Sequence, residues 1–177
     1  MDVLLYFILV LLTVTLLGAA VYDLTRFTLP NQVSWAVAGL FAVTAAAHFS
    51  LPVMLSHLAS GAVVFAVTYG LWQVRVMGGG DVKFWAATAL WFELPQLPHQ
   101  LFAVALSGGV VALVLISLRR GLARYMRTAD RRNEDVQLPR GLQVGGPVPY
   151  GVAIAAGTLW ALFTSAPGYF ATVLTIG

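Results

Sequence analysis

The sequence predicts an all-α polytopic membrane protein with about six transmembrane helices, its amino terminus outside and its fourth helix short. Of the 177 residues, 59% are hydrophobic and only 10% are charged, and the mean hydropathy is +0.84. Soluble domains carry about 25% charged residues. Six apolar runs follow one another, and most approach the roughly 20 residues that a spanning helix needs. We therefore interpret residues 1–177 as a single membrane domain.

The first apolar run extends from Val3 to Tyr22 and ends at Asp23. A cleaved signal peptide is the alternative, because Gly18 is followed by two small residues. Such a peptide needs a positive amino-terminal region, whereas this one carries only Asp2. We therefore expect an uncleaved first helix. Pro30 and Asn31 mark the turn into the second helix, since proline stops a helix and Asn favours the start of one.

The later runs follow the same pattern of apolar stretch and polar break. They cover residues 33–49, 53–74, 82–92, 100–118 and 148–167, and a polar segment, 119–146, separates the last two. The fourth run has about 11 residues and would extend only about 16 Å as a helix, less than a full crossing. The segment 119–146 is rich in Arg and closes with several glycines, which predicts an amphipathic or mobile cytoplasmic loop.

The basic residues set the orientation. They are Arg26, Arg75, Lys83, Arg119, Arg120, Arg124, Arg127, Arg131, Arg132 and Arg140. If the amino terminus is outside, all ten fall in the inner connections and none in the outer ones, as the positive-inside rule requires. This distribution also explains the isoelectric point near 9.6 without nucleic acid, because inner connections contact anionic lipids.

Two aspartates end up on the same side of the membrane. Asp23 follows one crossing and Asp81 follows two more, so both lie at the cytoplasmic surface beside apolar helices. Two neighbouring carboxyl groups that share one proton supply both a general base and a general acid. The glycines before Asp81 allow a close approach of backbone or substrate. Arg26 and Lys83 are candidates for holding one aspartate ionised.

Other interpretations of the two aspartates are open at this point. Asp81 follows three glycines and would suit the N-cap of a helix, and Asp23 beside Arg26 would suit a surface anchor. A proton- or ion-coupled transporter would use Asp23 and Asp81 as a relay, although such acids usually lie deeper in the spans. A non-catalytic scaffold would tolerate neutral residues at both positions.

The remaining residue types favour no cofactor and no metal. The chain has no cysteine, which excludes disulfides, thiolate metal sites and cysteine nucleophiles. Its three histidines, His48, His57 and His99, are expected near the outer face, far from Asp81. The glycine run lacks the Gly-Lys-Ser/Thr ending of a phosphate-binding loop.

Three motifs resemble those of the type IV prepilin peptidases, a family of GxGD membrane aspartic proteases. The segment 23–31 is similar to the family's first motif, an Asp followed about six residues later by an aliphatic residue, Pro and Asn. The segment 78–83 resembles the GxGD motif with its lysine. The segment 147–157 resembles the Pro-Tyr-Gly segment that opens the last helix. The three occur in the family's order. The resemblance therefore covers essentially the whole chain.

The resemblance implies an aspartic endopeptidase of the prokaryotic inner membrane, with its active site facing the cytoplasm. Its substrates would be prepilins or pilin-like proteins, whose basic leader peptides it would remove. Asp23 and Asp81 match the catalytic pair. Supporting roles fall on the other motif residues: Gly78, Gly80, Lys83, Pro30, Asn31, Pro149, Tyr150 and Gly151.

The resemblance is to the short form of the family, as in tight-adherence (Flp-type) pilus systems. That form lacks the domain with zinc-binding cysteines that long members of the family carry. The resemblance therefore implies peptidase activity without methyltransferase activity. The predicted partners are the prepilin and the lipid bilayer, with no nucleic acid. The sequence gives no indication of an oligomeric state.

Overall fold

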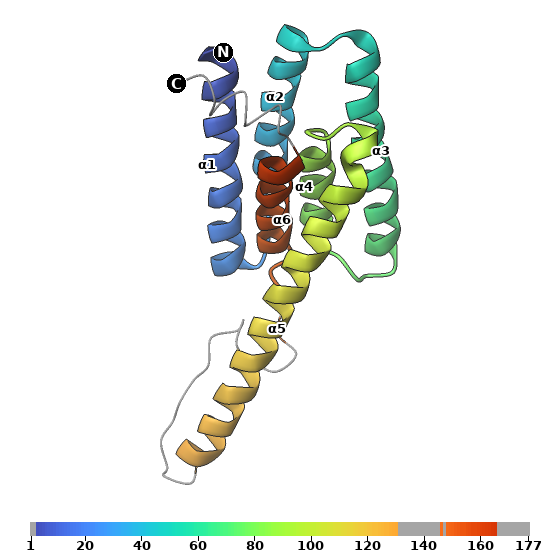
Figure 1. The fold of residues 1–177 in the computed structure, drawn as a ribbon. Helices are drawn as coiled ribbons and strands as arrows, with labels where there is room; N and C mark the ends of the chain where they lie inside the picture. The colour runs from blue at the N-terminus through green and yellow to red at the C-terminus, as the bar shows by residue number, and fades with distance from the viewer. Residues whose placement is uncertain (1–2, 131–145, 147, 166–177) are drawn as a thin grey trace.

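A computed structural model describes residues 3–130, 146 and 148–165. In this part of the chain the protein is all-helical, with six α-helices and one short 3-10 helix and no strand. The elements are α1 (Val3–Arg26), α2 (Asn31–His48), α3 (Leu51–Gln73), α4 (Gly79–Ala89), η1 (Leu94–Gln96), α5 (Leu97–Asp130) and α6 (Tyr150–Ser165). Helices α1, α2, α4, α6 and α3 form an upright bundle, and α5 crosses it obliquely (Figure 1).

Three segments are long and apolar enough to cross a membrane: α1, α3 and Leu94–Tyr125. The other helices are shorter, with 18 residues in α2, 16 in α6 and 11 in α4. Many large apolar side chains of the bundle face outward, such as Val14 of α1 at 60% exposed and Val67 of α3 at 62%. Apolar surface on this scale suits contact with lipid.

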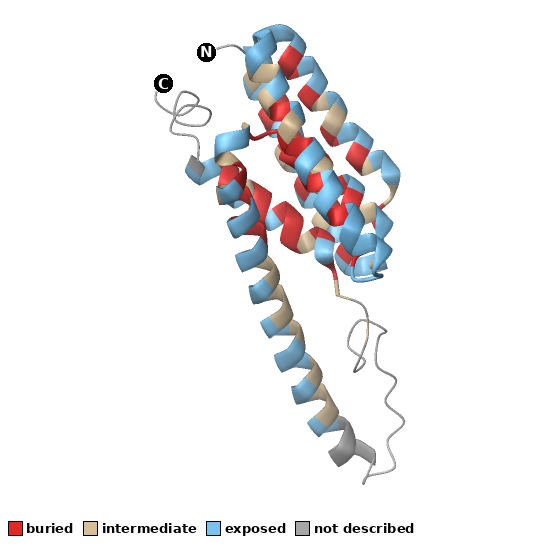
Figure 2. Ribbon diagram, turned by 90° about the vertical axis from the view of Figure 1, so that its right-hand side faces the viewer, coloured by how far each residue is buried: buried red, intermediate tan, exposed pale blue. Residues whose placement is uncertain are grey.

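The core lies where α1, α2, α4 and α6 meet, and α5 contributes the buried Ala103 and Val104 to it. Helix α3 packs mainly against α4, and the buried residues lie within the bundle (Figure 2). Its most completely buried side chains include Leu12, Leu16, Phe84, Phe92 and Ile154. Helices α5 and α6 approach very closely at Gly157. A Cβ there would collide with backbone atoms of Ala103 and Val104, so this helix pair requires a residue without a side chain at position 157.

Two helices end at non-glycine residues with positive φ. Phe27 has φ 53° and its N–H donates to the carbonyl of Asp23 at 2.8 Å, which closes α1. Arg75 has φ 60°, and Val76 N–H donates to the Leu71 carbonyl at 3.0 Å, the pattern of a Schellman motif. Both turns lie at the end of the bundle where α2, α4 and α6 begin (Figure 1).

Helix α4 is short, as the sequence predicts, but it begins earlier than the apolar run. Its N-cap is Gly78, and Asp81 lies in the first turn. The interpretation of Asp81 as an N-cap residue is therefore wrong. Glycine supplies no capping side chain, and the carboxylate of Asp81 reaches back to the N–H of Gly78 instead.

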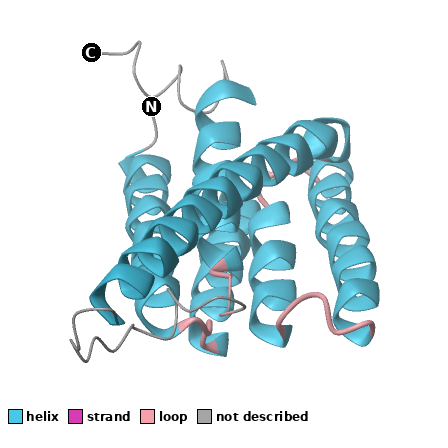
Figure 3. Cartoon of the chain, turned by 90° about the horizontal axis from the view of Figure 1, so that it is seen from below, coloured by secondary structure: helices cyan, strands magenta, loops and turns pink. Residues whose placement is uncertain are grey.

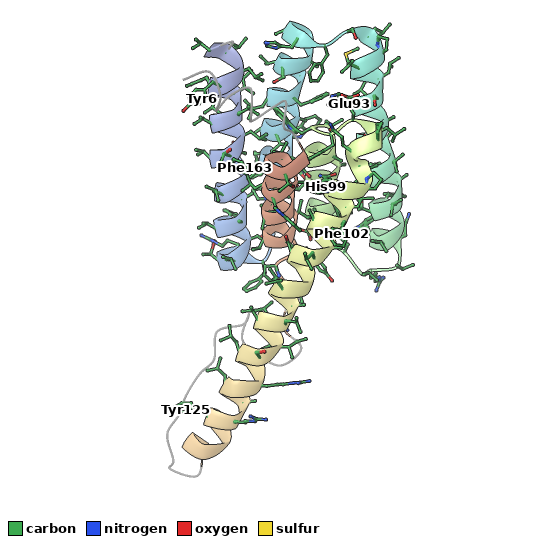
Figure 4. All side chains as sticks on the ribbon, in the orientation of Figure 1. Tyr6, Glu93, His99, Phe102, Tyr125 and Phe163 are labelled. Carbon is green, nitrogen blue, oxygen red and sulfur yellow. The ribbon has the colours of Figure 1, made fainter. Side chains whose placement is uncertain are left out.

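Helix α5 continues 12 residues beyond the predicted end at Leu118. Residues 119–130 of the expected loop 119–146 are helical, while 131–145 lie outside the described residues. Leu, Ala and Arg are good helix formers, and extending a helix avoids the cost of nucleating a new one. At 34 residues α5 is about 51 Å long, and it projects past the bundle with Tyr125 on the projecting part (Figure 4). Seen from below, it runs diagonally across the bundle (Figure 3).

We expect Gly157→Ala to destabilise the protein by about 1 to 3 kcal/mol, because the methyl group has only backbone atoms to displace. Thermal unfolding in detergent measures the effect. Gly39→Ala is the matched control, since a Cβ on Gly39 meets nothing within 4 Å. Equal melting temperatures for the two variants would contradict the close approach of α5 and α6.

Candidate active site

Asp23 is a buried carboxylate held by the start of another helix. It lies one turn before the end of α1 and is only 2% exposed. Its Oδ2 atom accepts a hydrogen bond from Val152 N–H at 3.3 Å, and its carboxylate also accepts from the N–H of Gly151. Both donors belong to the first turn of α6, where free N–H groups and the helix dipole favour a negative charge.

Asp81 lies across from Asp23 in the first turn of α4. The side chain is partly buried, and its pKa is raised from 3.8 to about 6. Burial is the main cause, and the negative charge of Asp23 is the second; the hydrogen bond from Gly78 opposes them. The influence of Asp23 on this pKa indicates that the two carboxyl groups lie within electrostatic range of each other, although 58 positions (81 minus 23) separate them in the sequence.

Leu29 explains why glycines occur on both α4 and α6 beside the aspartates. A Cβ on Gly80 would lie 2.5 Å from the Leu29 carbonyl oxygen, and a Cβ on Gly151 would lie 2.6 Å from Leu29 Cδ1 and 2.9 Å from Asp23 Oδ2. All three distances are shorter than van der Waals contact. The buried Leu29 therefore packs between the two helices only because neither has a side chain at these positions.

The other predicted site residues are distributed around this centre. Pro30 is the N-cap of α2, Asn31 begins that helix, and Lys83 Nζ donates to Asn31 Oδ1 at 3.0 Å. Lys83 follows Asp81 by two residues, so it lies about 200° around α4. It faces away from the carboxyl pair. Pro149 is buried immediately before α6, whereas the Tyr150 side chain is exposed.

The structure adds three residues that sequence reasoning did not select for the site: Leu29, Val152 and Arg119. Arg119 Nη2 donates to the carbonyl of Gly146 at 2.9 Å and thus ties α5 to the segment that leads into α6. Leu29 offers one signal, because it is the aliphatic residue before Pro30 in the motif 23–31. Val152 acts through its backbone, and no side-chain pattern reveals that role.

The arrangement suits acid–base chemistry on a water molecule. The residues of α6 hold one carboxylate by two N–H groups, and the raised pKa lets the other carboxyl group hold a proton up to about pH 6. One group can accept a proton from water while the other donates to a carbonyl oxygen. Such a pair needs no covalent nucleophile.

A model of the type IV leader peptidase family matches residues 9–113. The match spans 105 of the 177 residues (113 minus 9, plus 1) and includes Asp23, the turn at Leu29 and the motif 78–83. It ends before Gly151, which the fold nevertheless places against Asp23. Searches among curated proteins and among solved structures return no match.

We expect Asp81→Asn to stabilise the protein by about 1 to 2 kcal/mol at pH 7.5, since it removes a carboxylate whose ionised form is disfavoured by burial and by Asp23. An aspartate with a raised pKa does not lower the free energy of unfolding at a pH below its ordinary pKa of 3.8. The loss of stability grows as the pH rises, until the pH exceeds about 6. The stabilisation should therefore disappear near pH 4. Melting temperatures of parent and variant across this range measure it, and a difference that does not vary with pH would contradict the coupling.

Proposed function

The chain belongs to the type IV leader peptidase family, and on this premise we propose that it is a membrane aspartic endopeptidase that cleaves the basic leader peptide from prepilins or pilin-like proteins with Asp23 and Asp81. One observation carries the assignment of these two residues. They are the carboxyl groups that the ends of α1 and α4 bring together, under the first turn of α6. Gly78 and Gly151 lie directly beside the two carboxyl groups, and Gly80 packs on Leu29.

The surroundings of the two groups suggest different roles. Asp23, whose carboxylate accepts hydrogen bonds from Gly151 and Val152, is assigned the role of base and takes a proton from water as that water attacks the scissile carbonyl carbon. Asp81, protonated, donates its proton to the carbonyl oxygen. When the tetrahedral intermediate collapses, the ionised Asp81 takes back a proton from one of its hydroxyl groups, the C–N bond breaks, and the proton held by Asp23 passes to the leaving amine. The pair then again holds one proton in total.

The proposed topology places this chemistry at the cytoplasmic face of a prokaryotic inner membrane. Arg26, Arg75 and Lys83 all occur at the end of the bundle where Asp23 and Asp81 lie, which supports an inner location for that end. Helices α2 and α6 would add further crossings, and the short α4 would enter from the inner face without crossing completely, all within a single domain of 177 residues. A prepilin carries its basic leader before an apolar helix, so its scissile bond would reach the same plane. That the chain is the short form of the family is part of this proposal.

We expect Asp23→Asn and Asp81→Asn each to reduce leader cleavage by about 10²- to 10⁴-fold, the usual contribution of a general acid or base. Purified variants are incubated with a prepilin, and the shortened product is quantified. Glu93→Gln is the control, because Glu93 follows the end of α4 that is opposite to Asp81. Figure 4 shows Glu93 near the upper part of α3, far from the start of α4. Retained cleavage in either Asn variant would end the aspartic-protease assignment. If the Asn variants instead kept cleavage but lost proton-coupled transport across vesicle membranes, the transporter interpretation would be supported.

We expect kcat/KM to fall as pH rises above about 6, since Asp81 then loses the proton that it must donate. Initial rates of cleavage between pH 5 and pH 9 measure the profile. Parallel melting curves separate loss of the proton from loss of fold. An activity that stays constant up to pH 9 in folded protein would contradict the role of Asp81 as the acid.

A further inference from the structure

A cavity on the far side of α4 from the aspartates is not used by the proposed reaction. It has a volume of about 440 Å³ and lies between α2, α3 and α4. Its walls are small or apolar side chains, among them Ala38, Ala62, Phe65 and Ala87. Lys83 and Leu90 line it from opposite ends of α4, so it follows that helix for about 10 Å.

Polar groups gather at one end of this cavity. Lys83 and Asn31 line it there, and their mutual hydrogen bond leaves the ammonium charge without a carboxylate partner among the described residues. Ser34, one turn along α2, is 8% exposed, and its Oγ atom has no hydrogen-bond partner in the part of the chain described. The N-terminus of α2 adds backbone N–H groups, because its N-cap, Pro30, offers no side-chain acceptor.

The depth of the cavity restricts what fits. Helix α4 has 11 residues and is about 16 Å long, roughly half of the hydrocarbon thickness. Above it, Trp91 donates to the Val37 carbonyl at 3.3 Å and His57 bonds to the Leu90 carbonyl, so this region is filled by protein. A transmembrane peptide helix is about 10 Å wide and about 30 Å long. A lipid chain, in contrast, occupies one leaflet.

We propose that this cavity binds one anionic phospholipid of the leaflet on the Lys83 side, with an acyl chain along α4 and the phosphate at Lys83, Asn31 and the start of α2. Lys83 supplies the positive charge, and Ser34 donates to an ester or phosphate oxygen. Trp35, 76% exposed at the cavity mouth, lies at the depth where indole rings favour the membrane interface. The basic leader of a prepilin is repelled by Lys83, which favours lipid over substrate at this place.

The test uses the full chain purified in detergent. Phosphatidylglycerol or phosphatidylcholine is added, and retained lipid is counted by native mass spectrometry. We expect the parent to retain one phosphatidylglycerol about tenfold more strongly than phosphatidylcholine, the difference that one charged contact typically makes. Lys83→Gln should abolish this preference. Ala62→Phe, which fills the cavity from an exposed position, should reduce the retention of both lipids.

Matched controls separate the site from general attraction between lipid and basic protein. Arg26→Gln removes a charge at the same end of the bundle outside the cavity and should behave as the parent. Inorganic phosphate should not displace the lipid, because the acyl chain contributes to binding. Equal retention of the two lipids by the parent, or undiminished preference in folded Lys83→Gln and Ala62→Phe, would overturn the proposal. Photo-crosslinking of a prepilin from position 62 would show instead that the cavity receives substrate.

Discussion

The structure depends on keeping two carboxyl groups close together where water is scarce. Like charges at short range oppose each other, and burial disfavours each charge separately. The protein reduces this cost at Asp23 by directing two N–H groups of α6 at its carboxylate, and it lets Asp81 retain a proton. The turn at Leu29 holds the arrangement, because it packs against both Gly80 and Gly151. The three sequence motifs therefore form one packed unit.

The shortness of α4 connects the candidate active site with the proposed lipid site. Asp81, in its first turn, and Lys83, two residues later, lie on opposite faces, so the same helix borders both the candidate active site and the cavity of the proposed lipid. Its other end is fixed by neighbours: His57 bonds to the carbonyl of Leu90 at 2.9 Å and stacks on Phe49 at 4.6 Å. Contacts at both ends orient a helix that is too short to be anchored by its own crossing of the membrane.

Helix α5 joins the bundle to the segment before α6. The pair α5 and α6 approaches closely at Gly157, and Arg119 reaches the carbonyl of Gly146 from the helical extension. The start of α6 is the part that contacts Asp23. The helical extension of α5 thus helps to position the N–H groups of Gly151 and Val152, which is a structural role for a segment expected to be a loop.

The sequence by itself determined the helical class and the short fourth helix, and it predicted Asp23 and Asp81 as a pair. These follow from local hydrophobic runs, from the parity of crossings and from motifs of adjacent residues. The tertiary structure decided which groups meet. Lys83 turns away from Asp81, His57 is buried rather than interfacial, Leu29 fills the space between two glycines, and α5 continues to Asp130. Contacts of this kind depend on the relative rotation and closeness of packed helices, and hydropathy along one chain does not specify either.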